Sequence, residues 1–431
     1  MSELTLTFEN TATCAAQLDE QDALKGFRDE YYVPVINGKD SIYFNGNSLG
    51  LQPKATQEYV LDEMEDWASF GGEGHFHARN PWVKYNELFP ESIGKIVGAL
   101  PHEVIVMNNL TVNLHLMLTT FYRPTKEKFK IICEAKAFPS DQYVFQSQVK
   151  NHGFSIEEAI IEVHPRAGEY DLRQEDIEAI IDTHKNELCL VLFGGINYYT
   201  GQVFNMKAIT DAAHAAGAYC GFDLAHAVGN VPLSMHDWNV DFACWCTYKY
   251  LNSSPGGVAG AYIHEQFVTD KTLPRLAGWW GQDKATRFKM EKEFDPIPTA
   301  EGWQLSNGPI LLMAAHKAAL DLFDAAGMEN LFKKAQQLSN YMMFIVDDIN
   351  AGLPNKRIEI ITPRDEMQKG CQTSLLIPEN GRAIFDGLRN AGVIADWREP
   401  NVIRVAPTPM YNSFTDIYNF GVILKQLVSS V

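Results

Sequence analysis

The chain has 431 residues, of which 46% are hydrophobic and 21% are charged, an ordinary composition for a globular protein. Its 54 aspartates and glutamates outnumber 36 lysines and arginines, which gives a formal net charge of −18. A surface of that sign repels phosphate backbones, so we expect no nucleic-acid partner. The length favours two or three structural domains and is sufficient to bury a water-poor site.

Targeting signals and metal motifs are not expected in this chain. The start, MSELTLTFEN, has acidic residues and no apolar core behind a basic segment, so we expect no secretory leader. No stretch is apolar enough to predict a membrane span. The seven cysteines include no C-x-x-C pair, and the alternating His75/His77 and Cys244/Cys246 lack zinc spacing, so we expect no metal site. Several cysteines lie in apolar runs such as FACWCTY, which indicates buried, reduced thiols in a cytoplasmic protein.

The first half of the chain predicts an α/β fold. An arm over residues 1–45, with a helix at about 14–30, precedes a mainly helical stretch at 55–100. Short apolar strands then alternate with helices, and Ser140, Asp171 and Asn205 are placed to cap three of these helices. This alternation implies right-handed βαβ units and a mostly parallel sheet covered on both faces. The predicted strands are 130–134, 188–193, 218–223 and 242–248.

The pattern changes near residue 310. A long helical stretch at 311–350 leads to the strand-like runs RIEIITP, CQTSLLIP, GVIADWR and NVIRVAP, with a helix at 381–391 among them. A final helix starts near 413, where Ser413 and Asp416 are spaced like a capping box. These features predict a smaller α+β domain with antiparallel strands. We therefore divide the chain into an arm at 1–45, a large domain at 46–310 and a small domain at 311–431.

Candidate site residues follow the predicted strands, because ligands of open parallel sheets bind at the carboxyl ends of the strands. Asp141 comes after the strand KIICE, and Gly194 comes after LVLF. Asp223 and His226 follow AYCGF, and Lys249 follows DFACWCTY. A loop of this length is able to bring Asp223 and Lys249 to the same edge of the sheet.

Lys249 is the most informative of these residues. It is flanked by Tyr248 and Tyr250 beside a buried strand, and burial disfavours the charged form of a lysine. A free amine is able to attack an aldehyde and form a Schiff base. The alternative, which the spacing alone leaves open, is a lysine at a strand end that extends its charge into solvent.

Asp223 suits the aldehyde cofactor pyridoxal phosphate. The pyridine ring of that cofactor stores electrons only while its nitrogen is protonated, and a nearby carboxylate favours the protonated form. A helix-capping or salt-bridged aspartate is the alternative. Leu110 and Thr111 open an apolar helical run and offer N–H groups to a phosphate, although Asn109 also suits an ordinary helix cap. Phe138 is able to stack on a flat ring or to lie in a core.

Arg404 lies between apolar residues in NVIRVAP and so needs a partner. A substrate carboxylate held by two parallel hydrogen bonds would serve, and a buried salt bridge to an acid is the alternative. Neither G-x-G-x-x-G between a strand and a helix nor G-x-x-x-x-G-K-[ST] occurs, so dinucleotides and nucleoside triphosphates are not the expected ligands.

Six longer motifs together resemble the kynureninase family. They are YFNGNSLGLQPK, NNLTVNLHLML, AFPSDQY, GFDLAHAVGNVPL, DFACWCTYKYLNSSPGGVAGAYIHE and NVIRVAPTPMYNSF. The resemblance runs from about residue 30 to the end of the chain. It implies the fold of the aspartate aminotransferase-like pyridoxal-phosphate enzymes, an α/β architecture with a seven-stranded-type sheet in the large domain.

The resemblance also implies an activity, which is hydrolysis of the Cβ–Cγ bond of kynurenine or 3-hydroxykynurenine to (3-hydroxy)anthranilate and alanine. That reaction belongs to tryptophan catabolism and NAD precursor synthesis. The implied catalytic residues are Lys249, which would carry the cofactor, Tyr248 and Asp223. The implied cofactor contacts are Leu110, Thr111, Phe138, Asp141, Gly194, Asp223, His226, Tyr248, Lys249, Trp279 and Asn307, and the implied substrate contacts are His75, Ser306, Asn307 and Arg404.

Two further implications concern assembly and a departure from the family pattern. Trp279 and Asn307 would reach the site from a second subunit, so a homodimer is expected. Gly194 stands where relatives have a serine that touches the cofactor, so a backbone contact is expected there instead. The rival interpretations are a cysteine desulfurase-like lyase or an aminotransferase of the same fold, and a non-catalytic paralogue that acts as an interaction module. A desulfurase needs a cysteine on a mobile loop late in the chain, and Cys371 is the only cysteine after residue 300.

Overall fold

The computed structural model describes residues 8–355 and 357–430. Two compact units make up the chain. The large unit comprises residues 55–198 and 203–321, and the small unit comprises residues 1–54, 199–202 and 322–431. The division into an arm and two domains at residues 45 and 310 stays a prediction. The expectation that the chain starts without a secretory leader falls on residues 1–7, outside the described residues.

A seven-stranded sheet forms the centre of the large unit, in the order β4-β10-β9-β8-β7-β5-β6. Strands β6, β5, β7, β8 and β9 run parallel, whereas β10 is antiparallel to both β9 and β4. The expected mostly parallel sheet is therefore confirmed. The strands are β4 (Val104–Val106), β5 (Lys130–Glu134), β6 (Ile160–Val163), β7 (Leu188–Gly194), β8 (Tyr219–Asp223), β9 (Phe242–Trp245) and β10 (Gly260–Ile263).

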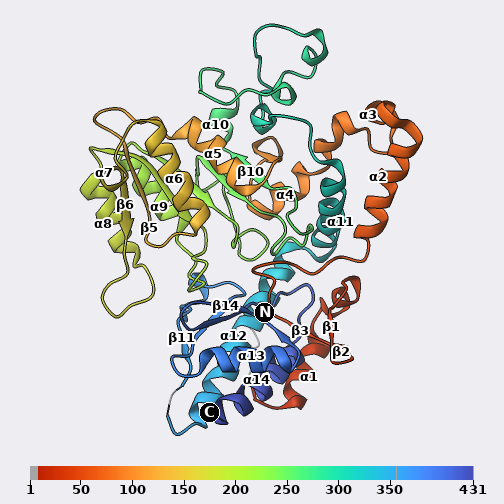
Figure 1. Cartoon of the computed structure of the whole chain (residues 1–431), viewed down its shortest axis with the longest axis vertical. Helices are drawn as coiled ribbons and strands as arrows, with labels where there is room; N and C mark the ends of the chain where they lie inside the picture. The colour runs from red at the N-terminus through yellow and green to blue at the C-terminus, as the bar shows by residue number, and fades with distance from the viewer. Residues whose placement is uncertain (1–7, 356, 431) are drawn as a thin grey trace, which may run out of the picture. The chain divides into compact units, whose positions relative to one another are not determined.

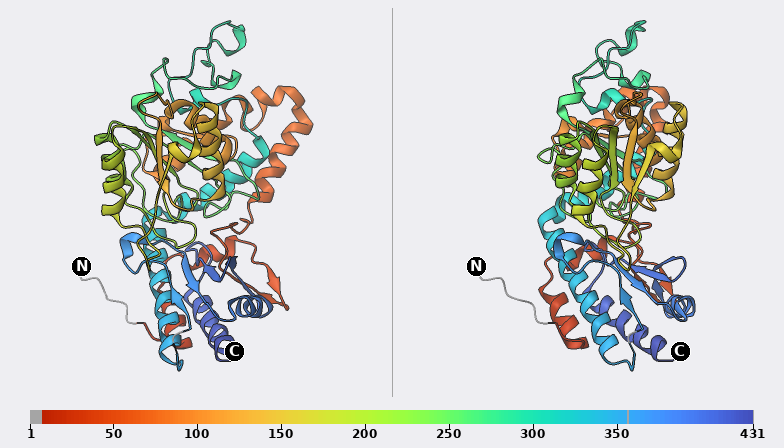
Figure 2. Two further views of the ribbon diagram at one scale, coloured as in Figure 1. Left: turned by 60° about the vertical axis from the view of Figure 1, so that its left-hand side comes forward. Right: turned by 90° about the vertical axis from the view of Figure 1, so that its left-hand side faces the viewer.

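Helices lie on both faces of this sheet (Figure 2), with α5 packed against α6 and α8 packed against α9. The expected cap at Asp171 is wrong, because α8 begins at Gln174 and Arg173 is its N-cap, which leaves Asp171 too early to reach the amides of the first turn. The α-helices that begin within the large unit are α2 (Thr56–Phe70), α3 (Gly74–His77), α4 (Pro90–Val97), α5 (Leu110–Phe121), α6 (Pro139–Asn151), α7 (Ile156–Ala159), α8 (Gln174–His184), α9 (Met206–Ala215), α10 (Glu265–Val268) and α11 (Ile310–Ala326). The 3₁₀ helices there are η2 (Gly71–Glu73), η3 (Trp82–Leu88), η4 (Pro101–Glu103), η5 (Trp279–Gly281), η6 (Arg287–Lys289) and η7 (Ala300–Trp303).

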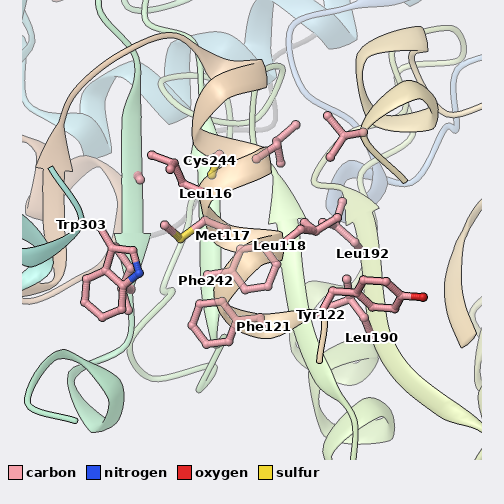
Figure 3. Packing of buried hydrophobic residues seen from close by; sticks show 14 of the residues in the cluster. Leu116, Met117, Leu118, Phe121, Tyr122, Leu190, Leu192, Phe242, Cys244 and Trp303 are labelled. Atoms are coloured by element: carbon pink, nitrogen blue, oxygen red, sulfur yellow. The ribbon is translucent and has the colours of Figure 1, made fainter. Parts of the chain in front are cut away.

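The core of the large unit lies between α5 and the sheet (Figure 3). Met117 and Phe121 of α5 are fully buried and pack with Leu190 of β7 and Phe242 of β9. The rings of Phe121 and Phe242 are stacked, with centroids 4.7 Å apart. Such contacts hold the first turn of α5 at a fixed place relative to the strand ends, because a close-packed core permits little sliding.

The small unit is built on an antiparallel sheet in the order β11-β12-β15-β14, as expected. The helices α12, α13 and α14 lie beside this sheet (Figure 1). The strands of the unit are β1 (Val35–Ile36), β2 (Lys39–Asp40), β3 (Ile42–Tyr43), β11 (Glu359–Ile360), β12 (Thr373–Leu376), β13 (Val393–Ile394), β14 (Asp396–Arg398) and β15 (Val402–Val405). Its helices are α1 (Ala12–Gln21), η1 (Lys25–Glu30), α12 (Met328–Ala351), η8 (Glu366–Gln368), α13 (Gly381–Asn390) and α14 (Phe414–Ser429).

Two predictions about helix ends have different outcomes: the cap at Ser413 is confirmed, and the single long helix at 311–350 is wrong. The capping box of Ser413 and Asp416 at the start of α14 is confirmed. The carboxylate of Asp19, in α1, also accepts hydrogen bonds from the backbone N–H groups of Phe414 and Thr415 at 2.7 and 3.0 Å. The long helix expected at 311–350 is two helices, because Gly327 takes a left-handed φ of 74° between α11 and α12.

The cysteines and the helix lengths test two further expectations from the sequence. All seven cysteines are buried and none forms a disulfide, which confirms the prediction of buried free thiols. Across the described residues, the helices are too short or too polar to traverse a lipid bilayer.

Candidate active site at the carboxyl edge of the large sheet

The carboxyl ends of four neighbouring parallel strands meet at one edge of the large sheet, which we call the rim. Glu134, Gly194 and Asp223 are the last residues of β5, β7 and β8. Gly194 is in register with Asp223, and Asp223 is in register with Cys244 of β9. Residues that follow these strands therefore emerge side by side, as the rule for parallel sheets predicts.

Lys249 lies on a turn after β9 and not at the end of a strand. The expected strand at 242–248 ends at Trp245, because the side chain of Thr247 bonds to Ser253 and to the carbonyl of Val258 and so turns the chain back. The turn is closed by a hydrogen bond of 3.1 Å from the N–H of Asn252 to the carbonyl of Lys249. This arrangement presents the lysine at the rim on a short, well-anchored segment.

The amine of Lys249 lies against His226 and Phe138. Its Nζ atom is 3.0 Å from Nε2 of His226 and 5.9 Å from the centroid of the Phe138 ring. His226 is buried, and the ring of Phe138 is partly exposed and meets the ring of Tyr198 edge-on at 5.2 Å. An amine beside an aromatic ring with one open face is a suitable place to bind a flat aldehyde.

Two buried carboxyl groups share a proton beside this amine. Burial raises the pKa of Asp141 well above its usual range, and the charge and hydrogen bond of Asp223 raise it further. Burial also raises the pKa of Asp223, although the hydrogen bond from Asp141 and the charge of Lys249 oppose the shift. The pKa of Asp141 is raised further than that of Asp223, so Asp141 is the member of the pair that keeps a proton and donates a hydrogen bond to Asp223. Asp223 also accepts a 2.8 Å bond from the N–H of Ala225. The carboxylate that results is buried and suited to a cationic ligand.

A third buried carboxyl group at the rim, Glu134, was missed by the sequence analysis. Burial raises its pKa to about 7, although hydrogen bonds from Asn197 and from the N–H of Gly194 oppose the shift. The only signal in the sequence was an acid at the end of an apolar strand, KIICE. A strand-ending glutamate is too common to single out by pattern alone.

The amino end of α5 has the donor groups that suit a phosphate. Asn109 is the N-cap and its side chain accepts a 3.1 Å bond from the N–H of Val112. Leu110 and Thr111 are the first helical residues, so their N–H groups have no partner within the helix and point along the positive end of the helix dipole. Thr111 is exposed, and its hydroxyl adds a further donor.

These groups fit pyridoxal phosphate. The amine of Lys249 suits the aldehyde, the buried carboxylate of Asp223 suits a protonated ring nitrogen, and the open end of α5 suits the phosphate. Tyr248 is buried enough that its pKa is raised, chiefly by burial and further by the neighbouring Cys246, so its hydroxyl keeps its proton at neutral pH.

The remaining predicted residues of the large unit make their hydrogen bonds and ring contacts with near neighbours. Trp279 donates to the carbonyl of Arg287 and is half exposed. Ser306 and Asn307 are exposed and bond to each other, and His75 bonds to the carbonyl of Gly72. Within one chain, these bonds do not join the four residues to Lys249.

Arg404 is fully buried on β15 of the small unit. Its Nε atom donates a 3.0 Å hydrogen bond to one carboxylate oxygen of Asp396, and its Nη2 atom forms an ion pair with the same oxygen at 2.9 Å. Arg398 forms an ion pair with that oxygen at 2.9 Å and donates a 3.3 Å hydrogen bond to the other oxygen. An acid partner is thus present, as one interpretation expected. A guanidinium presents five N–H groups in a planar fork, the geometry that binds a carboxylate through two parallel bonds.

One group among the described residues has the composition of a metal site. Atoms of Glu103, His236 and His264 lie within 4.8 Å of one another. The two imidazole rings are stacked almost parallel, and Glu103 accepts bonds from His236 and from the N–H groups of Leu100 and Glu265. Parallel rings do not aim their lone pairs at one point, so this geometry is that of a hydrogen-bonded cluster. The expectation of no metal stays a prediction.

Comparison with known families gives two overlapping matches. The family described as Aminotransferase class-V matches residues 42–368, and the Kynureninase C-terminal domain matches residues 331–424. A kynureninase of Flavobacterium psychrophilum is 54% identical over 98% of this chain and 99% of its own length. A kynureninase of Nematostella vectensis is 46% identical over 94% of this chain and 91% of its own length.

Solved structures resemble this chain in fold. The apo structure of a cysteine desulfurase from Thermococcus onnurineus NA1 superposes with a TM-score of 0.77 and covers 94% of this chain and 98% of its own. The cysteine desulfurase CsdA of Escherichia coli superposes with a TM-score of 0.74. Their identities of 17% and 13% support a shared architecture alone.

Proposed function

This chain belongs to the kynureninase family of pyridoxal-phosphate-dependent hydrolases, and from that premise we propose that Lys249 binds the cofactor and that the rim cleaves the Cβ–Cγ bond of kynurenines. The observation that carries the proposal is the position of the Lys249 amine, 3.0 Å from His226 beside the carboxylate of Asp223. When bound, the cofactor supplies an electron sink for the carbon next to the amino group. The products are alanine and anthranilate or its 3-hydroxy form.

The chain's own residues have separate tasks in this proposal. Asp223 holds the proton on the ring nitrogen, and the proton on Asp141 keeps the pair from carrying two negative charges. Lys249, once its amine is displaced by substrate, takes the proton from the α-carbon of the substrate. Tyr248 keeps its hydroxyl proton at neutral pH. It would donate a proton to the Cβ atom of the substrate, which becomes the methyl carbon of alanine.

The substrate contacts of the proposal come from Arg404 of the small unit and three residues of the large unit. Arg404 would hold the α-carboxylate of the substrate, since a guanidinium binds a carboxylate through parallel N–H bonds. His75, Ser306 and Asn307 would line the aromatic ring of the substrate, and with these residues we expect both kynurenine and 3-hydroxykynurenine to be accepted. The fluorescence of anthranilate and 3-hydroxyanthranilate released from each substrate would measure the preference.

The desulfurase alternative lacks its nucleophile. Cys371 is fully buried and precedes β12, so it is not on an exposed loop that could reach a substrate sulfur. Free, buried thiols along the whole chain also agree with a cytoplasmic enzyme, which we keep as part of the proposal.

The orientation of helix α2 supports a homodimer with shared sites, because this helix buries acidic side chains and exposes apolar ones. Its acids Glu63 and Asp66 are buried, where Trp82 Nε1 donates to Glu63 at 2.9 Å and the N–H of Arg79 donates to Asp66 at 2.7 Å. Its apolar side chains face outward instead, with exposed fractions between 41% and 61%, in a stripe of Leu61, Met64, Trp67 and Phe70. An outward apolar stripe of this kind marks a surface that another chain covers.

Substitution of Lys249 tests the proposed chemistry. Lys249→Ala should lose the visible absorbance of bound cofactor and lower turnover of kynurenine by about 10³-fold or more, because the amine and the base are removed together. Lys185→Ala, an exposed lysine at the end of α8, is the matched control and should behave like the wild type. A Lys249→Ala protein that stays yellow and turns over kynurenine would disprove the assignment.

Substitution on the apolar stripe tests the dimer. The double variant Met64→Glu with Trp67→Glu should sediment as a single chain, because two charges cannot be buried in an apolar contact without a large desolvation cost. Gln57→Glu adds a charge to an exposed polar position of the same helix and should leave the mass at two chains. If the double variant keeps the mass of a dimer, the stripe is not the interface.

A further inference from the structure

Glu134 is buried at the rim and has no part in the function proposed above. It ends β5 and is 3% exposed. Strand β5 lies beside β7, and β7 lies beside β8, so Glu134 is two strands away from Asp223 on the same edge. A buried acid is costly unless its oxygens are hydrogen-bonded, so its partners indicate what it does.

The two oxygens of Glu134 bind residues of the segment 194–197, which begins with the last residue of β7. Oε1 accepts a 3.1 Å bond from the N–H of Gly194, and Oε2 accepts a 2.5 Å bond from the side-chain amide of Asn197. The carboxylate thus spans the first and fourth residues of this segment. These two N–H donors favour the ionised form of the carboxyl group, because a bond to a charged acceptor is stronger than a bond to a neutral one.

Gly194 and Glu134 fit each other. A Cβ atom at position 194 would lie 2.8 Å from Oε1 of Glu134, closer than a real contact permits. The carboxylate therefore fills the space that a side chain at 194 would need. This accounts for the glycine where the family resemblance leads us to expect a serine.

The segment held by Glu134 leads to the ring beside the cofactor amine. Tyr198 follows Asn197, and its ring supports Phe138 edge-on with centroids 5.2 Å apart. Phe138 in turn lies 5.9 Å from the amine of Lys249. A shift of the segment would move the ring that is expected to stack on the cofactor.

We propose that Glu134 is a positioning residue for the cofactor, which acts by fixing Gly194 and Asn197 and, through Tyr198, the ring of Phe138. The proposal rests on the assignment of the rim as the cofactor site. It predicts that cofactor affinity depends on the hydrogen bond between Glu134 and Asn197, in which one side chain donates and the other accepts. The space that each side chain fills is not sufficient.

Exchange of donor and acceptor tests this bond. Asn197→Asp places two carboxyl groups in contact and should weaken cofactor affinity by about tenfold or more. Glu134→Gln should weaken it less, because the amide of Asn197 is able to turn its oxygen toward the new NH2 group. The two substitutions together restore a donor and an acceptor with the direction reversed. The double variant should recover affinity to within about threefold of the wild type. A double-mutant cycle over the four proteins then isolates the interaction between residues 134 and 197.

The measurements are the cofactor dissociation constant, from equilibrium dialysis of the full-length holoenzyme, and the wavelength and pH midpoint of the visible band. A merely structural role would lower the melting temperature and leave both of these readouts unchanged. Glu162→Gln on the neighbouring strand β6, where the acid is paired with exposed His164, is the matched control and should change neither.

The results separate this inference from the proposed function. If Lys249→Ala abolishes the visible band and the double variant binds cofactor as weakly as the worse single variant, the role of Glu134 is wrong and the cofactor site stands. An Asn197→Asp variant with wild-type affinity would overturn it equally. If Lys249→Ala keeps the band, the cofactor site itself has been misassigned.

Discussion

The rim of the large sheet and the antiparallel sheet of the small unit bury charges of opposite sign. At the rim, the carboxyl groups of Glu134, Asp141 and Asp223 are gathered near one amine, that of Lys249. Protons on these groups and N–H donors from the backbone limit the cost of burial. A site with this balance favours a cation, such as a protonated pyridine ring.

The small unit shows the reverse balance. Arg398 and Arg404 both form ion pairs with Asp396, and Arg404 is fully buried. The comparison teaches that the large sheet gathers acids around one amine, whereas the small sheet gathers two guanidinium groups around one acid. In the proposal above, the first environment would serve the cofactor and the second would serve the substrate carboxylate.

The largest effect expected from this comparison follows loss of the negative charge at the rim. Asp223→Asn should lower kcat by about 10²-fold or more, because the proton on the ring nitrogen loses its opposite charge. The KM for kynurenine should change only a few-fold, since the substrate carboxylate is held elsewhere. Steady-state kinetics and exchange of the substrate α-proton in D₂O would measure both.

Asp211→Asn, an exposed aspartate on α9, is the control for this variant. If Asp223→Asn exchanges the substrate α-proton at the wild-type rate, the negative charge at the rim is not needed for proton removal. The contrast between the two units would then carry no functional meaning.

A smaller and different effect is expected from the small unit. Arg404→Lys should raise KM by about 10-fold to 100-fold, because an ammonium group cannot form the planar pair of bonds that a guanidinium makes. The kcat and the visible absorbance should stay close to those of the wild type. Arg382→Lys, an exposed arginine on α13, is the matched control.

The split between KM and kcat decides this second test. A variant whose absorbance changes while its KM does not would mean that Arg404 serves the cofactor, and the assignment of anion binding to the small unit would fail.

The smallest effect is expected on stability and comes from the opposite edge of the large sheet, where the strands begin. There Asp241, buried, accepts bonds from the N–H of Cys220 at 2.6 Å and from His214 at 3.0 Å, and this acid raises the pKa of His214. A raised histidine pKa contributes stability that is complete below the unfolded value and is lost as pH rises through the folded value. His214→Gln should therefore destabilise the protein by about 1.5 kcal/mol at pH 5.5 and by less at pH 9.

Urea unfolding of both proteins at the two pH values would measure the difference, and kcat should not change. A stability loss that grows with pH would have the wrong sign and would exclude the ion pair as its cause.

The sequence predicted the elements whose signals are local. The strand 130–134, the cap at Asn205 and the capping box at Ser413 were found because each depends on residues within a few positions. The positions of Asp223 and Lys249 after neighbouring strands followed from one general rule about parallel sheets.

What the sequence did not predict depends on partners far along the chain. The strand β9 ends at Trp245 and not at Tyr248, because Thr247 bonds to residues of the returning turn. Glu134 gains its meaning only from Asn197, 63 positions later. The break at Gly327 was missed because apolar periodicity continues on both sides of it.

The contact between Asp19 and the start of α14 has a consequence for how the protein is made. A ribosome adds on the order of 10 residues per second, so α1 leaves the exit tunnel well before its partner helix has been translated. Residues 55–321, which hold the large sheet, are complete before that partner appears. The small unit is then closed by the last stretch of nascent polypeptide, and premature termination anywhere before residue 414 leaves α1 without the helix that it caps.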